Sequence, residues 1–242
     1  MQKKQNSTKD NTKQDNIIDM FDDIASNYDL ANRILSFNVD TKWRKEACKQ
    51  ALKLINNNNL KIVDIACGTG DMILNWLKFS KDSRILGIDP SINMLNIARN
   101  KLPNEVKLIQ GEAKDIAIDD GKLDVLSIAY GLRNVVEIDR ALGEFHRVLK
   151  TNGILVILEF TRKDNENILD KIASFYTKHI LPLLGGLISN NYKAYRYLPN
   201  SIGDFLTLEE LEEKLKILGF LVKVKKRYIA NLCSLIIAQK VN

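Results

Sequence analysis

The stretch IVDIACGTGD, residues 62–71, places an apolar run directly before two glycines. The apolar run, interrupted only by Asp64, is typical of a strand buried on both faces of a sheet. Gly68 and Gly70 indicate a turn in which the backbone passes close to another group. A glycine turn after the first strand of a doubly wound sheet lies where such sheets bind their ligands. The stretch therefore predicts the first strand of such a sheet and a ligand site beside it.

Strand-like and helix-like segments alternate outward from this stretch. Strands are expected at residues 61–66, 84–89, 106–111, 123–130, 153–160, 220–228 and 233–240. Helical patterns fill the intervals, with Ser91 as an expected N-cap and Thr207 to Glu210 as an expected capping box. The alternation predicts an α/β fold, a doubly wound, mostly parallel seven-stranded Rossmann-like sheet. The short connection between the last two strands makes them an antiparallel pair.

The rest of the chain divides by composition. Residues 1–15 are polar and of low complexity, and we expect a disordered tail. Residues 16–242 are expected to form a single domain, in which residues 16–56 are a helical N-terminal cover. Residues 161–205 interrupt the alternation and are expected to form a lid insertion.

The composition narrows the classes of function. The 242 residues contain 45% hydrophobic and 27% charged side chains, which is ordinary for a globular protein, and the net charge of +6 is weak evidence for nucleic acid. Three scattered cysteines favour a reducing, cytoplasmic location, and two isolated histidines argue against a metal site. No apolar run approaches the length of a membrane span. We expect neither a metal nor a nucleic-acid partner.

The glycine turn leaves two classes of ligand open. The dinucleotide pattern G-x-G-x-x-G has Ile73 in place of its third glycine, and Asp71 would oppose a pyrophosphate. S-adenosylmethionine, which has no phosphate and a cationic centre, fits these acids better. Gly68, Thr69 and Gly70 would then approach the ligand.

Acids at the ends of the strands extend this hypothesis. Asp64 would order the loop and favour the cationic methionine part, and Asp89 would accept hydrogen bonds from the ribose hydroxyls. Glu112 and Ala113, after the third strand, would meet the adenine edge. The alternative for Asp89 alone is that it caps the next helix.

Several segments carry a resemblance to known methyltransferases. IVDIACGTGD, GIDPSINML (87–95) and HRVLKTNGILVILEF (146–160) resemble class I S-adenosylmethionine methyltransferases. MFDDIASNYDLANRILSF (20–37), YGLRNV (130–135) and YRYLPNSIGDF (195–205) are similar to the ubiquinone/menaquinone biosynthesis C-methyltransferase family, over roughly residues 17–220. The resemblance implies C-methylation of a demethylated prenyl quinol, demethylmenaquinol or the ubiquinol precursor.

The same resemblance suggests how the site works. Arg133 would face the developing phenolate, Asn134 would orient Arg133, and Tyr28 would complete the hydrogen-bond set. A positioned arginine acts as an electrostatic stabiliser, because it stays protonated. Phe175, Leu181, Leu183 and Leu184 of the lid would line a channel for the prenyl tail. Each residue has a structural alternative to its catalytic role. Arg133 would instead form a surface salt bridge, and Tyr28 would instead pack within the N-terminal cover.

A lipophilic substrate also implies a location at the membrane. We expect peripheral contact at the inner face of the membrane, through residues 42–45 or residues 223–227, although 223–227 also reads as a solvated edge strand. A homo-oligomer is expected as well. Four other functions stay open: a methyltransferase for a small phenol, amine or sterol; a nicotinamide-dependent oxidoreductase; an RNA-binding protein; and a non-catalytic methyltransferase-like subunit.

Overall fold

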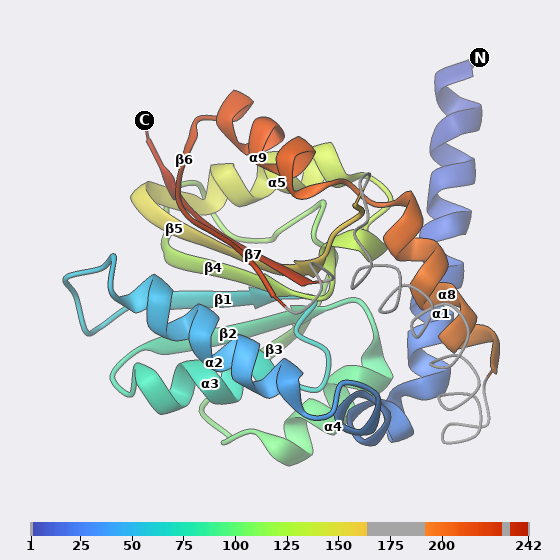
Figure 1. Cartoon of the computed structure of the whole chain (residues 1–242), viewed down its shortest axis with the longest axis horizontal. Coiled ribbons are helices and arrows are strands. Elements are labelled where there is room, and N and C mark those ends of the chain that lie inside the picture. The colour runs from blue at the N-terminus through green and yellow to red at the C-terminus, as the bar shows by residue number, and fades with distance from the viewer. Residues whose placement is uncertain (1, 164–191, 229–232, 242) are drawn as a thin grey trace.

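The computed structural model describes residues 2–163, 192–228 and 233–241 (Figure 1). Its helices are α1 (Gln2–Leu35), α2 (Val39–Leu52), α3 (Asp71–Phe79), α4 (Ile92–Lys101), α5 (Ile138–Val148), α8 (Tyr192–Asp204) and α9 (Leu208–Ile217), with a short 3₁₀ helix, η1 (Leu132–Asn134). Its strands are β1 (Lys61–Ile65), β2 (Arg84–Asp89), β3 (Lys107–Gln110), β4 (Leu123–Ala129), β5 (Leu149–Phe160), β6 (Phe220–Arg227) and β7 (Cys233–Lys240).

The seven strands form one sheet in the order β3-β2-β1-β4-β5-β7-β6. β1 to β5 are parallel to one another, and β7 runs antiparallel to both β5 and β6. The strand order reverses between β1 and β4, because β2 and β3 lie on one side of β1 and the later strands on the other. This confirms the predicted doubly wound sheet with its antiparallel C-terminal pair.

Helices cover both faces of the sheet (Figure 1). Trp76 of α3 and Cys48 of α2 belong to the core on one face, and Phe145 of α5 and Leu215 of α9 belong to the core on the other. The expected caps are present: Ser91 accepts a hydrogen bond from Met94 N at 3.1 Å, and Thr207 forms a capping box with Glu210. Local sequence therefore sets where these helices begin.

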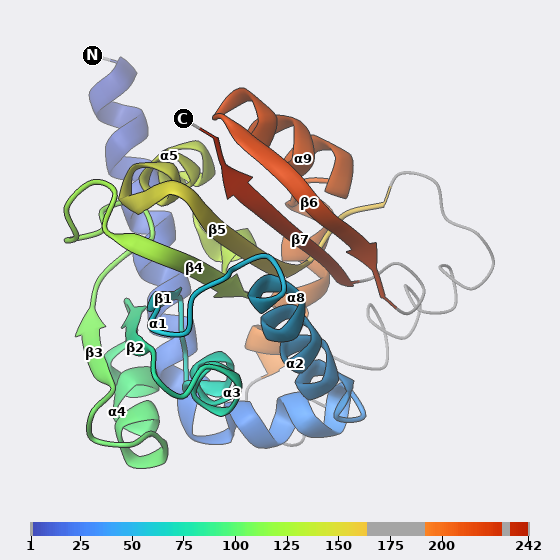
Figure 2. The ribbon, with the colours of Figure 1, turned by 90° about the vertical axis from the view of Figure 1, so that its left-hand side faces the viewer.

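Helix α1 stands at the carboxyl ends of the parallel strands, with α8 beside it (Figures 1 and 2). The structure corrects the expectation of a disordered tail, because residues 2–15 are part of α1. Gln14 is buried; it donates to Asn134 O at 3.3 Å and accepts from Val136 N at 3.0 Å. A tertiary contact, absent from any local pattern, thus holds this polar segment against the domain.

Only the ends of the expected lid lie within the described residues. Residues 161–163 continue from β5 and residues 192–205 contain α8, whereas Phe175, Leu181, Leu183 and Leu184 lie outside the described residues. Leu198 of α8 packs against a buried cluster that contains Ile24 of α1 and Met94 of α4. No helix in the described part of the chain is long and apolar enough to span a membrane.

Candidate functional site

A cavity of about 700 Å³, counted with its open mouth, lies at the carboxyl ends of β1, β2 and β4, beneath α1. Six residues named from the sequence line it: Tyr28, Gly68, Asp89, Glu112, Ala113 and Asn134. Asp64, Thr69, Gly70 and Arg133 are absent from its lining. The cavity occupies the reversal of strand order, where open α/β sheets bind ligands.

The turn after β1 has the backbone that its glycines predict. Gly68 has φ +54°, and a Cβ built on it would meet no atom within 4 Å, so the backbone there faces open space. Ala66 (φ 49°) and Tyr130 (φ 62°), which follow β1 and β4, are also left-handed, and both line the cavity. Left-handed residues other than glycine are strained and concentrate at functional sites. Gly131 lets these two turns lie close together, because a Cβ there would lie only 2.4 Å from Ala66 Cβ.

Asp89 is buried and organises the mouth of the glycine turn. Its Oδ2 accepts from Gly68 N at 2.7 Å, and its Oδ1 accepts from Ser91 N at 2.9 Å. Burial raises the pKa of Asp89 to about 6, and the two backbone N–H groups oppose the rise. Each carboxylate oxygen can accept a second hydrogen bond, so Asp89 holds the loop and keeps acceptor capacity.

Asp64 lies beneath the cavity and does not line it. Its Oδ1 accepts from Ser127 Oγ at 2.6 Å, and Ser127 Oγ accepts from Trp76 Nε1 at 2.9 Å. Burial raises its pKa to about 7, and the bond from Ser127 and the charge of Arg44 oppose the rise. Asp64 therefore joins β1, β4 and α3 below the ligand site.

Thr69 and Asp71 connect the glycine turn to the cover helix. Thr69 Oγ1 donates to Asp29 Oδ1 at 2.6 Å, and Lys101 Nζ contacts Asp29 Oδ2 at 2.7 Å and Asp71 Oδ1 at 2.5 Å. Arg33 of α1 also pairs with Asp71. Asp71, whose charge the sequence analysis used against a pyrophosphate, is thus paired with Lys101 and Arg33. These pairs fix α1 over the glycine turn.

Glu112 and Ala113 form the far wall of the cavity. Ala113 is buried, whereas Glu112 is half-buried and lies 3.4 Å from Lys114 Nζ. Glu112 and Asp115 also pair in a short backbone bridge. This wall presents small and polar groups, which suits the edge of a planar ring.

Arg133 and Asn134 follow β4 and share one acceptor. Arg133 Nη1 donates to Tyr130 O at 2.6 Å, and Asn134 Nδ2 donates to the same oxygen at 3.3 Å. Arg133 Nη1 also contacts Glu159 Oε1 at 2.6 Å, and both side chains are buried. Arg133 Nε and Asn134 Oδ1 are buried without a partner among the described residues.

Glu159 is a buried acid that sequence reasoning missed. It is 1% exposed at the end of β5, and besides Arg133 Nη1 it accepts from Arg133 N at 3.2 Å and Phe160 N at 2.8 Å. The signal was available, because Glu159 is the one acid in the apolar run GILVILEF. Arg133 supplies the cation that offsets the cost of burying this carboxylate.

Tyr28 reaches the cavity from α1 into the field of two guanidinium groups. Burial raises its pKa, and the charges of Arg133 and Arg44 oppose that rise. Arg44 is itself buried, with its guanidinium carbon 4.7 Å from the ring centre of Tyr130. The region beside Tyr28 therefore favours a phenolate over a phenol more than an apolar pocket would.

Other cavity residues were not singled out from the sequence. Phe21, Met94 and Tyr130 lie within the quoted motifs and line the cavity, whereas Gln14, which also lines it, lies in the segment expected to be a tail. Among the described residues, no group of three or more His, Cys, Asp or Glu side chains is arranged to hold a metal ion.

Comparisons with known proteins give one consistent match. Residues 8–240 match the model of the ubiE/COQ5 methyltransferase family. The chain is 50% identical to a ubiquinone/menaquinone biosynthesis C-methyltransferase UbiE of Campylobacter jejuni, over 94% of this chain and 99% of that protein. It is 40% identical to a demethylmenaquinone methyltransferase of Thermotoga maritima, over 87% of this chain and 90% of that protein.

Solved structures support the fold. A SAM-dependent methyltransferase from Thermotoga maritima superposes with a TM-score of 0.60 at 19% identity, covering 93% of this chain and 99% of that one. A SAM-dependent methyltransferase from Aquifex aeolicus gives a TM-score of 0.56 at 18% identity, covering 80% of this chain and 89% of that one. At these identities the likeness establishes the class I methyltransferase architecture alone.

Proposed function

The chain belongs to the ubiE/COQ5 methyltransferase family, and from this premise we propose that it methylates a ring carbon of a demethylated prenyl quinol in respiratory quinone biosynthesis, with S-adenosylmethionine as methyl donor. The observation that carries the proposal is the joint position of Gly68, Asp89 and Tyr28 around one cavity at the strand reversal. The relatives named for demethylmenaquinone favour demethylmenaquinol as a substrate, and those named for both quinones keep the ubiquinol precursor in view.

The residues on the β1–β2 side fit the methyl donor. Open space at Gly68 admits a ligand against the backbone, and Asp89 retains acceptor capacity for two vicinal hydroxyls. Glu112 and Ala113 would flank the adenine. S-adenosylmethionine, when bound, supplies a methyl group on a positively charged sulfonium.

The residues on the β4–β5 side fit the ring to be methylated. A quinone is a poor nucleophile, so the substrate is the reduced quinol, whose ring carbon becomes nucleophilic as its phenolic proton leaves. Arg133 would stabilise the developing phenolate, and it stays charged because Glu159 pairs with it. Asn134 and Tyr28 would hold the hydroxyl in place. Alignment of the two reactants can lower the barrier by about 7–11 kcal/mol.

Direct turnover tests the proposal. Purified full-length protein is given S-adenosylmethionine and chemically reduced demethylmenaquinol, with the oxidised quinone and the reduced benzoquinol precursor as parallel arms. Mass spectrometry is expected to find one added methyl group on a reduced substrate and none on the oxidised quinone.

Each result has a definite meaning. Methylation of both reduced rings would extend the activity to both quinone pathways. Binding of S-adenosylmethionine without methylation of either reduced ring would refute the quinol assignment. Absence of S-adenosylmethionine binding would refute the role given to Gly68 and Asp89.

A further inference from the structure

The end of the cover helix presents apolar side chains to solvent beside the cavity. Leu30 and Ile34 lie one turn apart on α1 and are 57% and 47% exposed. Tyr28, two residues before Leu30, lines the cavity, so a single turn of α1 has one side on the cavity and the other outward. Phe37, where the chain turns into α2, is 78% exposed. We call residues 30–37 the α1–α2 corner.

The helix that follows the corner carries a row of lysines. Lys42, Lys45, Lys49 and Lys53 are all exposed, and their spacing of three, four and four residues places them on one face of α2. In the described part of the chain, no carboxylate forms a salt bridge with any of the four. Lys49 instead lies 5.1 Å from the ring centre of Phe79. Among the described residues, the positive charge of this face is therefore not paired.

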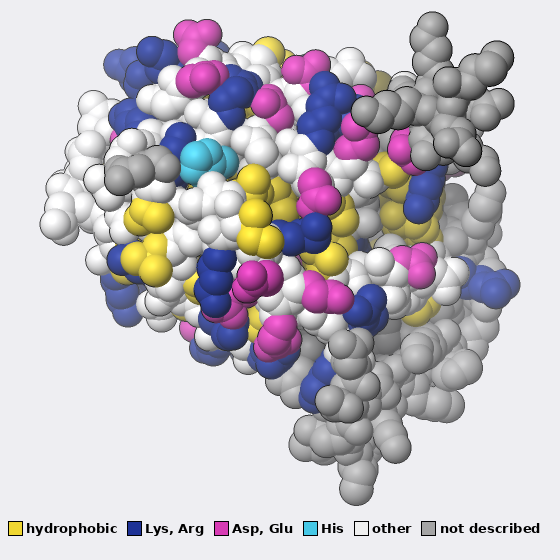
Figure 3. Space-filling view, turned by 90° about the horizontal axis from the view of Figure 1, so that it is seen from above, with side chains coloured by type: hydrophobic (Ala, Val, Ile, Leu, Met, Phe, Trp, Pro, Cys, Tyr) yellow, Lys and Arg dark blue, Asp and Glu magenta, His cyan; other side chains and the backbone are white. Residues whose placement is uncertain are grey.

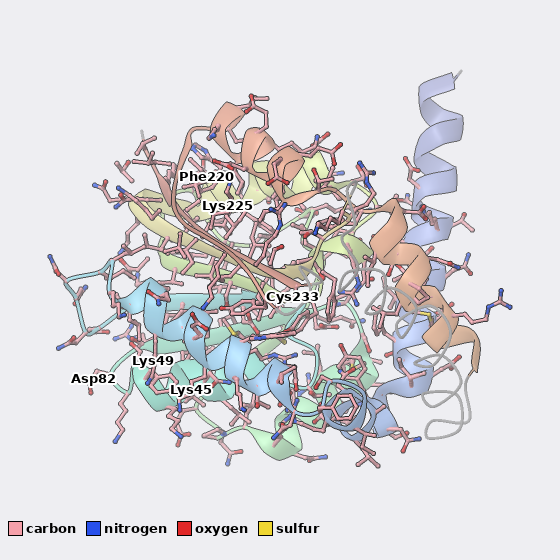
Figure 4. The ribbon with its side chains drawn as sticks, viewed as in Figure 1. Lys45, Lys49, Asp82, Phe220, Lys225 and Cys233 are labelled. Atoms are coloured by element: carbon pink, nitrogen blue, oxygen red, sulfur yellow. The ribbon has the colours of Figure 1, made fainter. Side chains whose placement is uncertain are left out.

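The other basic segment of the chain differs in this respect. On the edge strand β6, Lys225 pairs with Glu212, Lys226 with Glu46, and Arg227 with Glu209. Figure 4 shows Lys45 and Lys49 on α2, well separated from Lys225 on β6. Over α5 and α9, acidic and basic side chains alternate (Figure 3). Among the described residues, Lys223 is the one basic side chain of residues 223–227 without a salt bridge, whereas all four lysines of the α2 face lack one. The α2 face therefore has more unpaired positive charge for a partner.

We propose that the α1–α2 corner and the lysine face of α2 together dock on an anionic bilayer. Leu30 and Ile34 would enter the boundary between headgroups and acyl chains, and the lysines would contact headgroup phosphates. An exposed apolar side next to a lysine face is the pattern of surface-bound helices. A symmetric dimer through the same surface is disfavoured, because it would bring the two lysine faces together.

The position of the α1–α2 corner suggests what docking does for the enzyme, and this step rests on the proposed function. Because the corner continues the helix that covers the cavity, docking would bring the α1 side of the cavity close to the bilayer. A quinol with a prenyl tail could then approach the cavity without crossing bulk water.

Vesicle sedimentation tests the apolar half of the surface. Full-length protein is mixed with vesicles of equal parts phosphatidylcholine and phosphatidylglycerol, and the bound fraction is measured for the wild type, for Leu30→Gln/Ile34→Gln and for Ile217→Gln. Ile217 is the matched control, since it is 76% exposed on the distant α9. The double variant is expected to lose about tenfold in partitioning for each apolar side chain, and the control is expected to bind like the wild type.

Charge is tested in the same assay. Lys42→Gln/Lys45→Gln/Lys49→Gln is compared with Lys107→Gln/Lys122→Gln/Lys223→Gln, which removes the same charge from exposed positions elsewhere. The α2 variant is expected to lose about fivefold for each lysine, and the control much less. Wild-type binding should weaken with added salt and on vesicles of phosphatidylcholine alone.

Several outcomes would overturn the docking surface. The first is a wild-type protein that does not bind anionic vesicles. The second is a Leu30→Gln/Ile34→Gln variant that binds vesicles as the wild type does. The third is an equal loss of vesicle binding in the two triple lysine variants. A corner variant that only converts a dimer to a monomer in analytical ultracentrifugation would assign the corner to a second copy instead. Circular dichroism and thermal unfolding check that each variant folds.

A second readout separates this proposal from the proposed function. Methylation of a quinol without a prenyl tail, in the absence of vesicles, is expected to be equal in the wild type and in Leu30→Gln/Ile34→Gln. Vesicle binding without methyl transfer to any quinol would refute the proposed function and leave the docking surface standing. Methyl transfer to a quinol without vesicle binding would refute the docking surface and leave the proposed function standing.

Discussion

The two sides of the cavity differ in how many of their buried polar atoms have hydrogen-bond partners. On the β1–β2 side, both oxygens of Asp89 accept backbone N–H groups and Asp64 is bonded to Ser127. On the β4–β5 side, Arg133 Nε and Asn134 Oδ1 are buried without partners among the described residues.

This difference indicates how the two sides are used. An unpaired buried donor or acceptor costs about 1–3 kcal/mol, so an enzyme retains one where a ligand supplies the missing partner. One unpaired donor and one unpaired acceptor on consecutive residues suit a hydroxyl, which accepts and donates at once. We therefore expect the β1–β2 side to be preformed and the β4–β5 side to be completed by substrate.

The largest expected effect comes from Arg133. Arg133→Ala should lower turnover by about 10²–10³-fold, because it removes the charge beside the phenolate, and should leave the affinity for S-adenosylmethionine nearly unchanged. Steady-state kinetics and calorimetric titration with S-adenosylmethionine measure the two quantities. Arg140→Ala, at a position where the side chain is 55% exposed, is the matched control.

The loss of Arg133 also leaves Glu159 buried without its cation, which can destabilise the fold by about 3–5 kcal/mol. Arg133→Ala/Glu159→Gln removes that cost and separates folding from catalysis. Restored stability with turnover still low would agree with the assigned role. Restored turnover, or equal losses of turnover and of donor affinity, would contradict it.

The next effect concerns Asp64 and the stability of the β1–β2 side. Its folded pKa of about 7 lies above the ordinary value of 3.8, so the native state retains a proton that the unfolded state releases. Wild-type stability should therefore fall as pH rises from about 4 to about 7 and then level off. Asp64→Asn, which keeps an oxygen for Ser127, should raise the free energy of unfolding by about 3 kcal/mol at high pH and much less near pH 4.

Urea unfolding at pH 8 and at pH 4.5 measures this difference in stability, on the assumption of two-state behaviour. Asp139→Asn, at an exposed carboxylate, serves as the control. A stability gain independent of pH would contradict burial as the cause.

The smallest effect is expected at Asp89. Asp89→Asn should weaken S-adenosylmethionine about tenfold, because an amide offers one acceptor oxygen where the carboxylate offers two. Burial holds the pKa of Asp89 at about 6, so wild-type affinity should also fall as pH drops through 6, where the carboxylate gains a proton.

Titration of wild type and Asp89→Asn with S-adenosylmethionine between pH 5 and pH 8 tests this, with the exposed Asp82→Asn as control. The variant should lose the part of the pH dependence centred near 6. An unchanged profile in the variant would assign that dependence to another group.

Sequence reasoning reached further on the β1–β2 side than on the β4–β5 side. The turn at Gly68 and Gly70 directly follows β1, and Asp89 and the cap at Ser91 lie at the end of β2, so local patterns predict their positions. Arg133 of η1 and Glu159 of β5 lie 26 residues apart, and no local pattern predicts that they pair. The contact of Gln14 with Asn134, 120 residues away, likewise has no local signal.

Local sequence patterns predict the order of strands and helices along the chain, the caps, the glycine turn and the family, because each is carried by residues near one another in the chain. Tertiary packing sets which polar atoms meet a partner, which stay unpaired, and which lysines have no carboxylate beside them. Pairing depends on distances set by the packing of elements far apart in sequence. Alternation of apolar and polar residues specifies that an element packs, but not which side chain it meets.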